Sequence, residues 1–260
     1  MRIEQQMTRD GPWRTLANFR IKNPSQPAHQ PWSAEAIPAG KRLNGLAFAL
    51  GGLTMETTPF NKSDIWNQTV NLLLRVQTNT VTLTNWSAAH IEAEDASGNW
   101  EYVGAASTFT NNWILYQGWR GLDPRYVWKL EVDFCPASDF SPESLFHFEV
   151  PVSLPGPILT NVAGVPLEIS WVNRDMLAVE MLTNRSDLRL LFVSANDREG
   201  RNLDGTSGSW NQGRFWRTLR LDRTTQSVEA TIAIVPNVHV TYFVQPKFIR
   251  DAEQTNAVHF

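Results

Sequence analysis

The chain has 260 residues, which is enough for about two domains of ordinary size, each able to bury a core of its own. Its formal net charge is -3 and only 19% of its residues are charged, so no basic surface is expected and nucleic acid is excluded as a partner. The single cysteine, Cys135, excludes an intramolecular disulfide, and its position at the end of the run of residues 128–135 predicts a buried or half-buried strand residue.

Neither a membrane span nor a signal peptide is predicted. Residues 43–53 are apolar, but the stretch is interrupted by glycine and is shorter than the roughly 20 residues that cross a bilayer. Residues 1–10 are polar and of mixed charge, unlike a signal peptide. Arginine exceeds lysine, and asparagine, threonine and tryptophan are abundant, a composition that we associate with exported bacterial β proteins. An extracellular or cell-surface location is therefore favoured.

The N-terminal segment, residues 1–59, has a weak pattern that is punctuated by prolines at positions 12, 24, 27, 31 and 38. Proline fixes the backbone angle φ and removes a hydrogen-bond donor from a strand ladder. We therefore expect residues 1–59 to form an irregular segment that packs on the first module.

Residues 60–153 show the period-two alternation of half-buried strands. In residues 70–76 one face is apolar and the other carries Asn71, Leu73 and Arg75, and in residues 128–134 apolar side chains alternate with charged ones. The sequence Asp-Ala-Ser-Gly-Asn at residues 95–99 predicts the turn of a hairpin. No apolar stripe of helical period is long enough for a helix, so the unit is predicted to be all-β.

The next unit follows a short stretch of sequence Leu-Pro-Gly-Pro at residues 154–157. Two prolines and a glycine end a strand and stiffen a joint, which predicts a linker between domains here. Residues 158–250 are then expected to form a second β-sandwich module, followed by a C-terminal tail, residues 251–260. The strands expected in this module are residues 167–172, 176–182, 188–194, 216–221, 228–235 and 240–244.

The two units repeat a pattern at a distance of about a hundred residues. The tripeptide Leu-Thr-Asn occurs at residues 83–85 and 182–184, Trp-Arg occurs at 119–120 and 216–217, and alternating runs end at Pro136 and Pro236. A repeat as long as a small domain indicates a duplicated module rather than a short-repeat solenoid.

Residues 121–132 resemble the stretch of fibronectin type III and related immunoglobulin-like domains in which a Leu-x-Pro turn precedes a strand that opens with tyrosine. The resemblance implies two tandem antiparallel β-sandwich modules, with Tyr126 as the residue that ties the corner between two sheets. The second copy has neither the proline nor the tyrosine, and the cysteine pair of antibody domains is absent from both. The resemblance implies a fold and no particular activity.

The high tryptophan content, 11 residues in the chain, is the main indication of a binding function. Tryptophans in turn regions present flat rings to sugars or to a protein partner, and arginines stack on such rings. The alternative is that these rings fill the gap between two packed sheets. The candidate ligand- or partner-binding residues are Trp113, Trp119, Arg120, Trp210, Trp216 and Arg217.

Carboxylates offer a second candidate site. Glu92 and Glu94 share one face of a strand, and with Asp133 they would serve a polysaccharide hydrolase if they met across a cleft. The alternative is a solvated strand face. Oxygen ligands at residues 197–204 are compatible with a calcium ion or with ordinary turn chemistry.

No other signature of catalysis or of a cofactor occurs in the sequence. The five histidines share no metal-ligand spacing, and no phosphate-binding loop, nucleophile elbow or dinucleotide fingerprint is present, so no metal and no cofactor are expected. The favoured function is a non-enzymatic interaction or structural protein, a surface or appendage component that contacts protein partners or self-associates through sheet edges. Carbohydrate binding through exposed tryptophans and a β-sandwich hydrolase remain alternatives.

Overall fold

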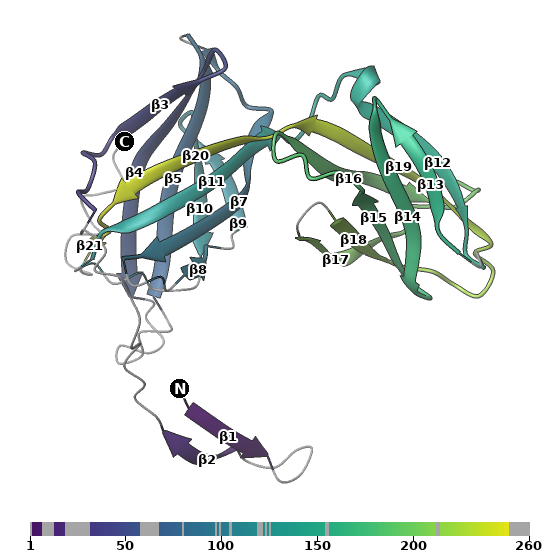
Figure 1. The fold of residues 1–260 in the computed structure, drawn as a ribbon, viewed down its shortest axis with the longest axis horizontal. Helices are drawn as coiled ribbons and strands as arrows, with labels where there is room; N and C mark the ends of the chain where they lie inside the picture. Colours follow the sequence, from purple (N-terminus) through teal and green to yellow (C-terminus); the bar gives the residue numbers. More distant parts are fainter. Residues whose placement is uncertain are drawn as a thin grey trace.

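The computed structural model describes residues 2–6, 13–18, 32–57, 68–79, 81–96, 98, 100–103, 106–118, 122, 124, 126–153, 156–211 and 214–249. This part of the chain is all-β, with sheets that are antiparallel apart from one parallel pair of strands, and with one three-residue helical turn, η2 (Pro142–Ser144). Two large groups of strands, the first body and the second body, lie side by side in Figure 1. No described helix has the length and apolar character needed to cross a membrane.

The first body consists of two sheets that close over one core. One sheet has the order β21-β4-β5-β10-β9, with β3 also on β4 and β6 on β5, and the other has the order β20-β11-β7-β8. Phe48 and Leu72 from the first sheet and Phe134 and Tyr242 from the second are fully buried in this core. The strands are β3 (Ala39–Leu43), β4 (Leu46–Thr57), β5 (Gln68–Thr78), β6 (Val81–Thr82), β7 (Trp86–Asp95), β8 (Trp100–Tyr102), β9 (Ala106–Thr110), β10 (Trp113–Gly118), β11 (Trp128–Pro136), β20 (Val238–Val244) and β21 (Lys247–Ile249).

The second body has the same two-sheet arrangement and a separate core. Its sheets have the orders β13-β14-β15-β18-β17 and β12-β19-β16. Leu167 and Leu177 of the larger sheet meet Leu190 and Ile232 of the smaller one in this core. The strands are β12 (Leu145–Pro151), β13 (Ile158–Val162), β14 (Val165–Asn173), β15 (Met176–Met181), β16 (Leu188–Asn196), β17 (Asp204–Asn211), β18 (Arg214–Leu219) and β19 (Ser227–Pro236).

The period-two alternation predicted from the sequence is confirmed where it is cleanest. On β11, Trp128, Leu130, Val132 and Phe134 are buried, whereas the residues between them face outward. On β5, Val70, Leu72, Leu74 and Val76 are buried in the same way. The reason is that successive side chains of a strand point to opposite faces of its sheet.

The expected irregular segment, residues 1–59, contains regular strands in its described residues. β1 (Arg2–Gln6) pairs with β2 (Trp13–Asn18) in a two-stranded sheet, and β3 pairs with β4 inside the first body. Only one of the five prolines, Pro38, is among the described residues, and it stands just before β3. The sequence after Pro38 is therefore free to pair, and Phe48, Leu50 and Met55 of β4 are part of the core.

The division of the chain between the two bodies also differs from the expected one. β12 follows β11 in the chain but pairs with β19 of the second body, and β20 follows β19 but pairs with β11 of the first. The chain thus crosses at residues 137–144 and again at Asn237, whereas β12 and β13, the strands on either side of the expected linker, both belong to the second body. Proline and glycine mark the end of a strand, but which sheet a strand joins depends on distant partners.

The two bodies repeat one connectivity. In chain order, β3, β4, β5, β7, β9, β10 and β11 of the first body take the same places as β13, β14, β15, β16, β17, β18 and β19 of the second. The place beside β11 belongs to β20, and the equivalent place beside β19 belongs to β12. Each body therefore contains the strand that follows the other body's last strand in the chain.

The junction between the bodies has an apolar centre, the junction cluster. Cys135 of β11 is buried there against Ala233 and Val235 of β19. Phe140, Leu145, Ala89 and Leu191 surround these three residues. Figure 1 shows β19 running directly into β20 across this junction. The bodies are thus in direct contact as well as joined by two stretches of chain.

Candidate functional site

Of the two candidate tryptophans of the first module, Trp113 and Trp119, only Trp113 is among the described residues. It opens β10 and lies on the opposite face of the strand from the buried Ile114. The Arg75 guanidinium carbon lies 4.1 Å from the centroid of its ring. The ring also covers Gly51, where an added Cβ atom would lie 2.6 Å from the indole. Glycine therefore permits a flat, half-exposed tryptophan stacked with arginine on the outside of the larger sheet.

Trp216 occupies a related position in the second body. It lies on β18, opposite Ala178 of β15 and Ser209 of β17, and it is half-buried. Its neighbour Arg217 is opposite the fully buried Leu177 and lies 5.9 Å from the centroid of the Phe192 ring. Arg217 thus faces the core, whereas Trp216 lies on the other face of the sheet.

The remaining candidates are placed only in part. Trp119 and Arg120 lie outside the described residues, and Trp210 is placed as a member of β17, paired with Phe215. Tyr126 lies just before β11 with 53% of its surface exposed. Its role as a corner tyrosine stays a prediction. The described candidates therefore do not form one site, because Trp113 and Trp216 belong to different bodies.

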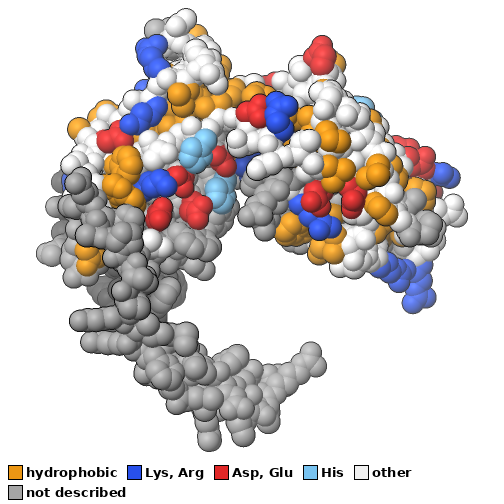
Figure 2. Space-filling view, in the orientation of Figure 1, with side chains coloured by type: hydrophobic (Ala, Val, Ile, Leu, Met, Phe, Trp, Pro, Cys, Tyr) orange, Lys and Arg blue, Asp and Glu red, His pale blue; other side chains and the backbone are white. Residues whose placement is uncertain are grey.

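A network of charged side chains covers the outer face of the sheet β20-β11-β7. His239 Nδ1 lies 2.9 Å from Asp133 Oδ1, and Lys129 Nζ lies 2.6 Å from Glu131 Oε1 and 3.4 Å from Glu94 Oε2. The register of the strands explains the network, since β11 places three outward residues between the outward residues of its two neighbours. Figure 2 shows histidine, acidic and basic side chains together on this side of the first body.

The carboxylates considered for hydrolysis lie in this network. Glu92 Oε2 is 3.4 Å from His90 Nε2, and Glu94 faces Lys129. Burial alone would raise the pKa of Asp133, but the hydrogen bond from His239 and the charges of His239 and Arg189 hold that pKa below its usual range. A general acid of a glycosidase needs a raised pKa. The network is therefore better suited to holding charges in place than to donating a proton.

Arg189 extends the network across the junction. It stands on β16 of the second body, is 4% exposed, and donates a hydrogen bond from Nη2 to the Ala89 carbonyl oxygen of the first body at 3.0 Å. Its Nη1 lies 3.5 Å from Asp133 Oδ2. Ala89 is the extra residue of a β-bulge in β7, which leaves its backbone groups unpaired within the sheet. The bulge thus gives Arg189 its acceptor.

Sequence reasoning considered Asp133 but missed Arg189 and His239. The signal for Arg189 was a single charge within the apolar run of residues 188–193. It shares a strand face with Leu191 of the junction cluster, opposite to the face that Leu190 turns to the second core. No signal pointed to His239, because its partner Asp133 is 106 residues away. Contacts between such distant residues depend on strand pairing, which the local pattern does not specify.

The loop considered for calcium is a turn stabilised by Asp197. This carboxylate is buried, accepts hydrogen bonds from the backbone N–H groups of Glu199 and Arg201, and pairs with the Arg201 guanidinium at 2.5 Å. Its oxygens are thus engaged within the protein. Within the described part of the chain, no three acidic, histidine or cysteine residues are grouped so as to hold a metal ion.

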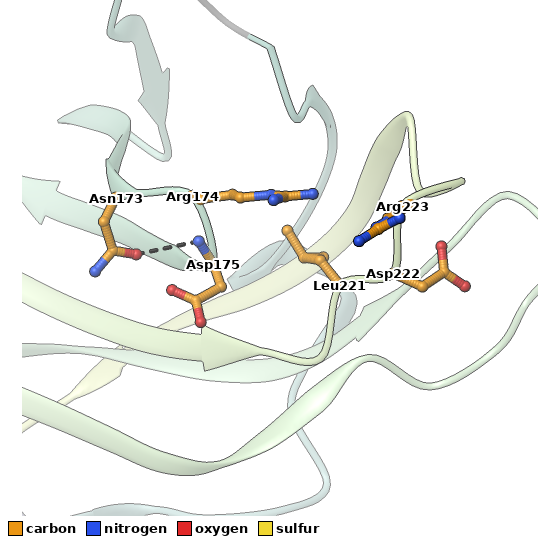
Figure 3. Close-up of a pocket in the computed structure, with 6 residues that line it drawn as sticks. All are labelled: Asn173, Arg174, Asp175, Leu221, Asp222 and Arg223. Carbon is orange, nitrogen blue, oxygen red and sulfur yellow. Dashed lines mark hydrogen bonds between the residues drawn. The ribbon is translucent and has the colours of Figure 1, made fainter.

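An open cavity of about 600 Å³ lies at the turn between β14 and β15 and the loop after β18. Figure 3 shows Arg174 reaching toward Arg223, with Leu221 between them. Asp222 also lines the cavity, and hydrogen bonds from Thr224 and Thr225 hold the pKa of its carboxyl below the usual range. The lining has mixed charge, because Asp175 and Asp222 lie beside the two guanidinium groups, and it therefore indicates no particular ligand.

Comparisons with known proteins add no relative. The sequence matches no family model, and searches among curated proteins and solved structures find no similar protein.

Proposed function

We propose that the protein is a non-enzymatic structural or interaction protein, built from two duplicated immunoglobulin-like β-sandwich modules, that contacts protein partners and copies of itself as a surface or appendage component. The observation that carries this proposal is the junction between the two bodies. Each body contains a strand that follows the other's last strand, the junction cluster is apolar, and Arg189 joins the second body to Asp133 and Ala89 of the first.

Such a junction fixes the orientation of the two bodies relative to each other, and therefore of the surfaces that each presents to partners. Two bodies joined by a single flexible linker rotate freely, whereas two crossings and a buried contact restrict their relative motion. A component that carries load or positions partners needs this property. A hydrolase needs instead a pair of carboxylates with different pKa values across a cleft, whereas Glu92, Glu94 and Asp133 lie on an outer sheet face beside histidine or lysine side chains.

The test is an association measurement combined with an activity screen. We expect sedimentation velocity over a wide range of protein concentration to show self-association, and a broad polysaccharide panel to show no turnover. Turnover that disappears in both Glu92→Gln and Asp133→Asn variants would contradict the proposal and favour the hydrolase alternative. Glu143→Gln, at an exposed carboxylate outside the network, is the matched control.

A second function, carbohydrate binding, is favoured by one observation: Trp113 and Trp216 both lie on the side of a larger sheet that faces away from the core. Aromatic rings in such positions stack on sugar rings. Titration of tryptophan fluorescence with soluble polysaccharides tests it. Binding that is lost in Trp216→Ala or Trp113→Ala but kept in Val172→Ala, an exposed position of the second body, would support this function; no response to any polysaccharide would dispose of it.

A further inference from the structure

We propose that β20, together with β21, is an exchangeable strand, and that the first body accepts this segment from a second copy of the chain as well as from its own. The proposal rests on the proposed function for its choice of partner, a second copy, and on the strand topology for the site. The acceptor is the groove of the first body between β11 and the segment that contains Glu35.

β20 fills this groove and completes both the sheet and the core of the first body. Val238, Val240, Tyr242 and Val244 point into the core and are at most 7% exposed. The backbone of β20 pairs with β11 over seven positions, from Trp128 opposite Val244 to Phe134 opposite Val238. Without this segment, the edge of β11 and the centre of the core would be open to water.

The far edge of β20 is also engaged. The Glu35 backbone N–H donates to the Phe243 carbonyl oxygen at 2.6 Å, and the Phe243 N–H donates to Glu35 Oε1 at 3.1 Å. The Trp32 and Phe243 rings pack with their centroids 5.4 Å apart. β21 adds parallel pairing with β4, from Lys247 opposite Thr54 to Ile249 opposite Glu56. The groove therefore recognises the segment on both edges.

The exchange already takes place inside one chain. β12 and β20 occupy equivalent places in the two bodies, yet each follows directly in the chain from a strand of the other body. β12 follows β11 but pairs with β19, and β20 follows β19 but pairs with β11. If the copies were independent, β12 would return beside β11 and β20 beside β19. The observed arrangement is thus a reciprocal strand exchange between duplicated modules, the intramolecular form of domain swapping.

The hinge of the exchange is short and anchored to the second body. Between β19 and β20 stands Asn237, directly after Pro236. Its backbone N–H donates to the Asp187 carbonyl oxygen at 2.8 Å, and its Nδ2 donates to the Ser186 carbonyl oxygen at 3.0 Å. β20 therefore leaves the second body in a fixed direction and cannot fold back beside β19.

A second copy offers the same groove with the same contacts. The contacts of β20 with β11, β4 and Glu35 are the same whichever chain supplies the strand. The chain's own strand is favoured by its effective concentration and by the junction that joins the two bodies, so exchange between chains requires folding at a high concentration of chains. Chains joined in this way through the groove form dimers, or longer assemblies when the exchange does not close.

The test uses full-length chains with single reactive cysteines at residues that face each other across the two strands. Glu131 is directly opposite Thr241, and such residues have Cβ atoms about 5 Å apart, within reach of a short bis-maleimide cross-linker. On a Cys135→Ala background, one chain has Glu131→Cys and the other has Thr241→Cys. The two are unfolded together in urea, refolded at high protein concentration and then cross-linked.

We expect a covalently linked pair of the two chains on a denaturing gel, more abundant at higher refolding concentration and scarce when the folded proteins are simply mixed. The control replaces the second chain by one with Asp187→Cys, an exposed position of the second body that does not face Glu131. A chain with both Glu131→Cys and Thr241→Cys links within itself and reports that the groove has formed.

Absence of the linked pair, while the double variant links within itself, would overturn the proposal. Oligomers that form without the link would also overturn strand exchange and leave the proposed structural role standing. A linked pair from a protein that also hydrolyses polysaccharide would support the exchange and contradict the structural role.

Discussion

Arg189 is a buried charged residue of the second body that contacts the first body at their junction. We expect Arg189→Ala to lower the free energy of unfolding by about 3 kcal/mol, because it leaves the Ala89 carbonyl oxygen in the junction without this donor and leaves Asp133 with His239 as its remaining partner. Urea denaturation measures the loss. Arg185→Ala, which breaks an exposed ion pair with Asp187, should leave the midpoint unchanged; an equal loss in both variants would contradict the role of Arg189.

His239 should make the stability of the first body depend on pH. The hydrogen bond to Asp133 is the largest cause that raises the pKa of His239 above its usual value, and Glu131 adds to it while Lys129 opposes it. The stabilisation is therefore fully present below the ordinary histidine pKa and is lost as pH rises through the raised one. Because His239 is half-exposed, the change should stay below about 1 kcal/mol.

Urea denaturation of the wild type and of His239→Gln between about pH 6 and pH 9 measures this effect. The wild type should lose stability toward the alkaline end, and the variant should show a smaller slope. Asp133 has the opposite dependence, since its lowered pKa means that its contribution is lost only as pH falls through that value. An unchanged alkaline slope in the variant would show that another group titrates.

At the scale of an element, β20 is the strand whose packing is easiest to test, through Tyr242. Its side chain is fully buried in the first core, and its hydroxyl has no hydrogen-bond partner among the described residues. Tyr242→Ala should cost about 3–5 kcal/mol through the cavity that it leaves. Tyr242→Phe removes only the unsatisfied hydroxyl and should be neutral or stabilising by about 1 kcal/mol.

Thermal and urea unfolding of the two Tyr242 variants separate these effects. A large loss in Tyr242→Phe would mean that the hydroxyl has a partner that the described residues do not include. Burial raises the pKa of this hydroxyl above its usual range, so it stays protonated over the whole range of such measurements.

At the scale of the whole molecule, the shared strands make the first body depend on the end of the chain. A chain truncated after Asn237 lacks β20 and β21 and exposes the core positions that four side chains of β20 would fill. At about 1.5–3 kcal/mol for each buried side chain, the loss is comparable with the entire stability of an ordinary domain. We expect this truncated chain to keep the second body and to unfold the first.

Limited proteolysis with mass spectrometry, together with circular dichroism, measures this outcome. Protected fragments should begin near β12 and end within β19, while peptides of β4, β5 and β7 should appear early. Truncation after residue 250 retains β20 and β21 and is the matched control, expected to be as resistant as the full chain. Equal resistance of both truncated chains would show that the first body folds without the strand.

The sequence by itself determined the local structure of this protein. Period-two alternation in residues 70–76 and 127–134 specified which side chains are buried, because every second side chain of a strand lies on the same face. The absence of a helical stripe determined the all-β class, and the turn residues marked the ends of strands. The repeat at about a hundred residues pointed to two similar units. Burial pattern, fold class and strand ends depend on residues that are close in the sequence, and the repeat is visible from the similarity of two stretches of the sequence.

Only the tertiary structure decided which strands belong together. β12 and β20 have ordinary strand patterns, and nothing in their alternation specifies that each joins the body on the other side of the junction. The pairs of Arg189 with Asp133 and of His239 with Asp133 follow from that choice. The physical reason is that strand pairing joins backbone groups that are alike in every residue, so the partner is selected by which groove buries the most apolar surface, a property of the assembled sheets.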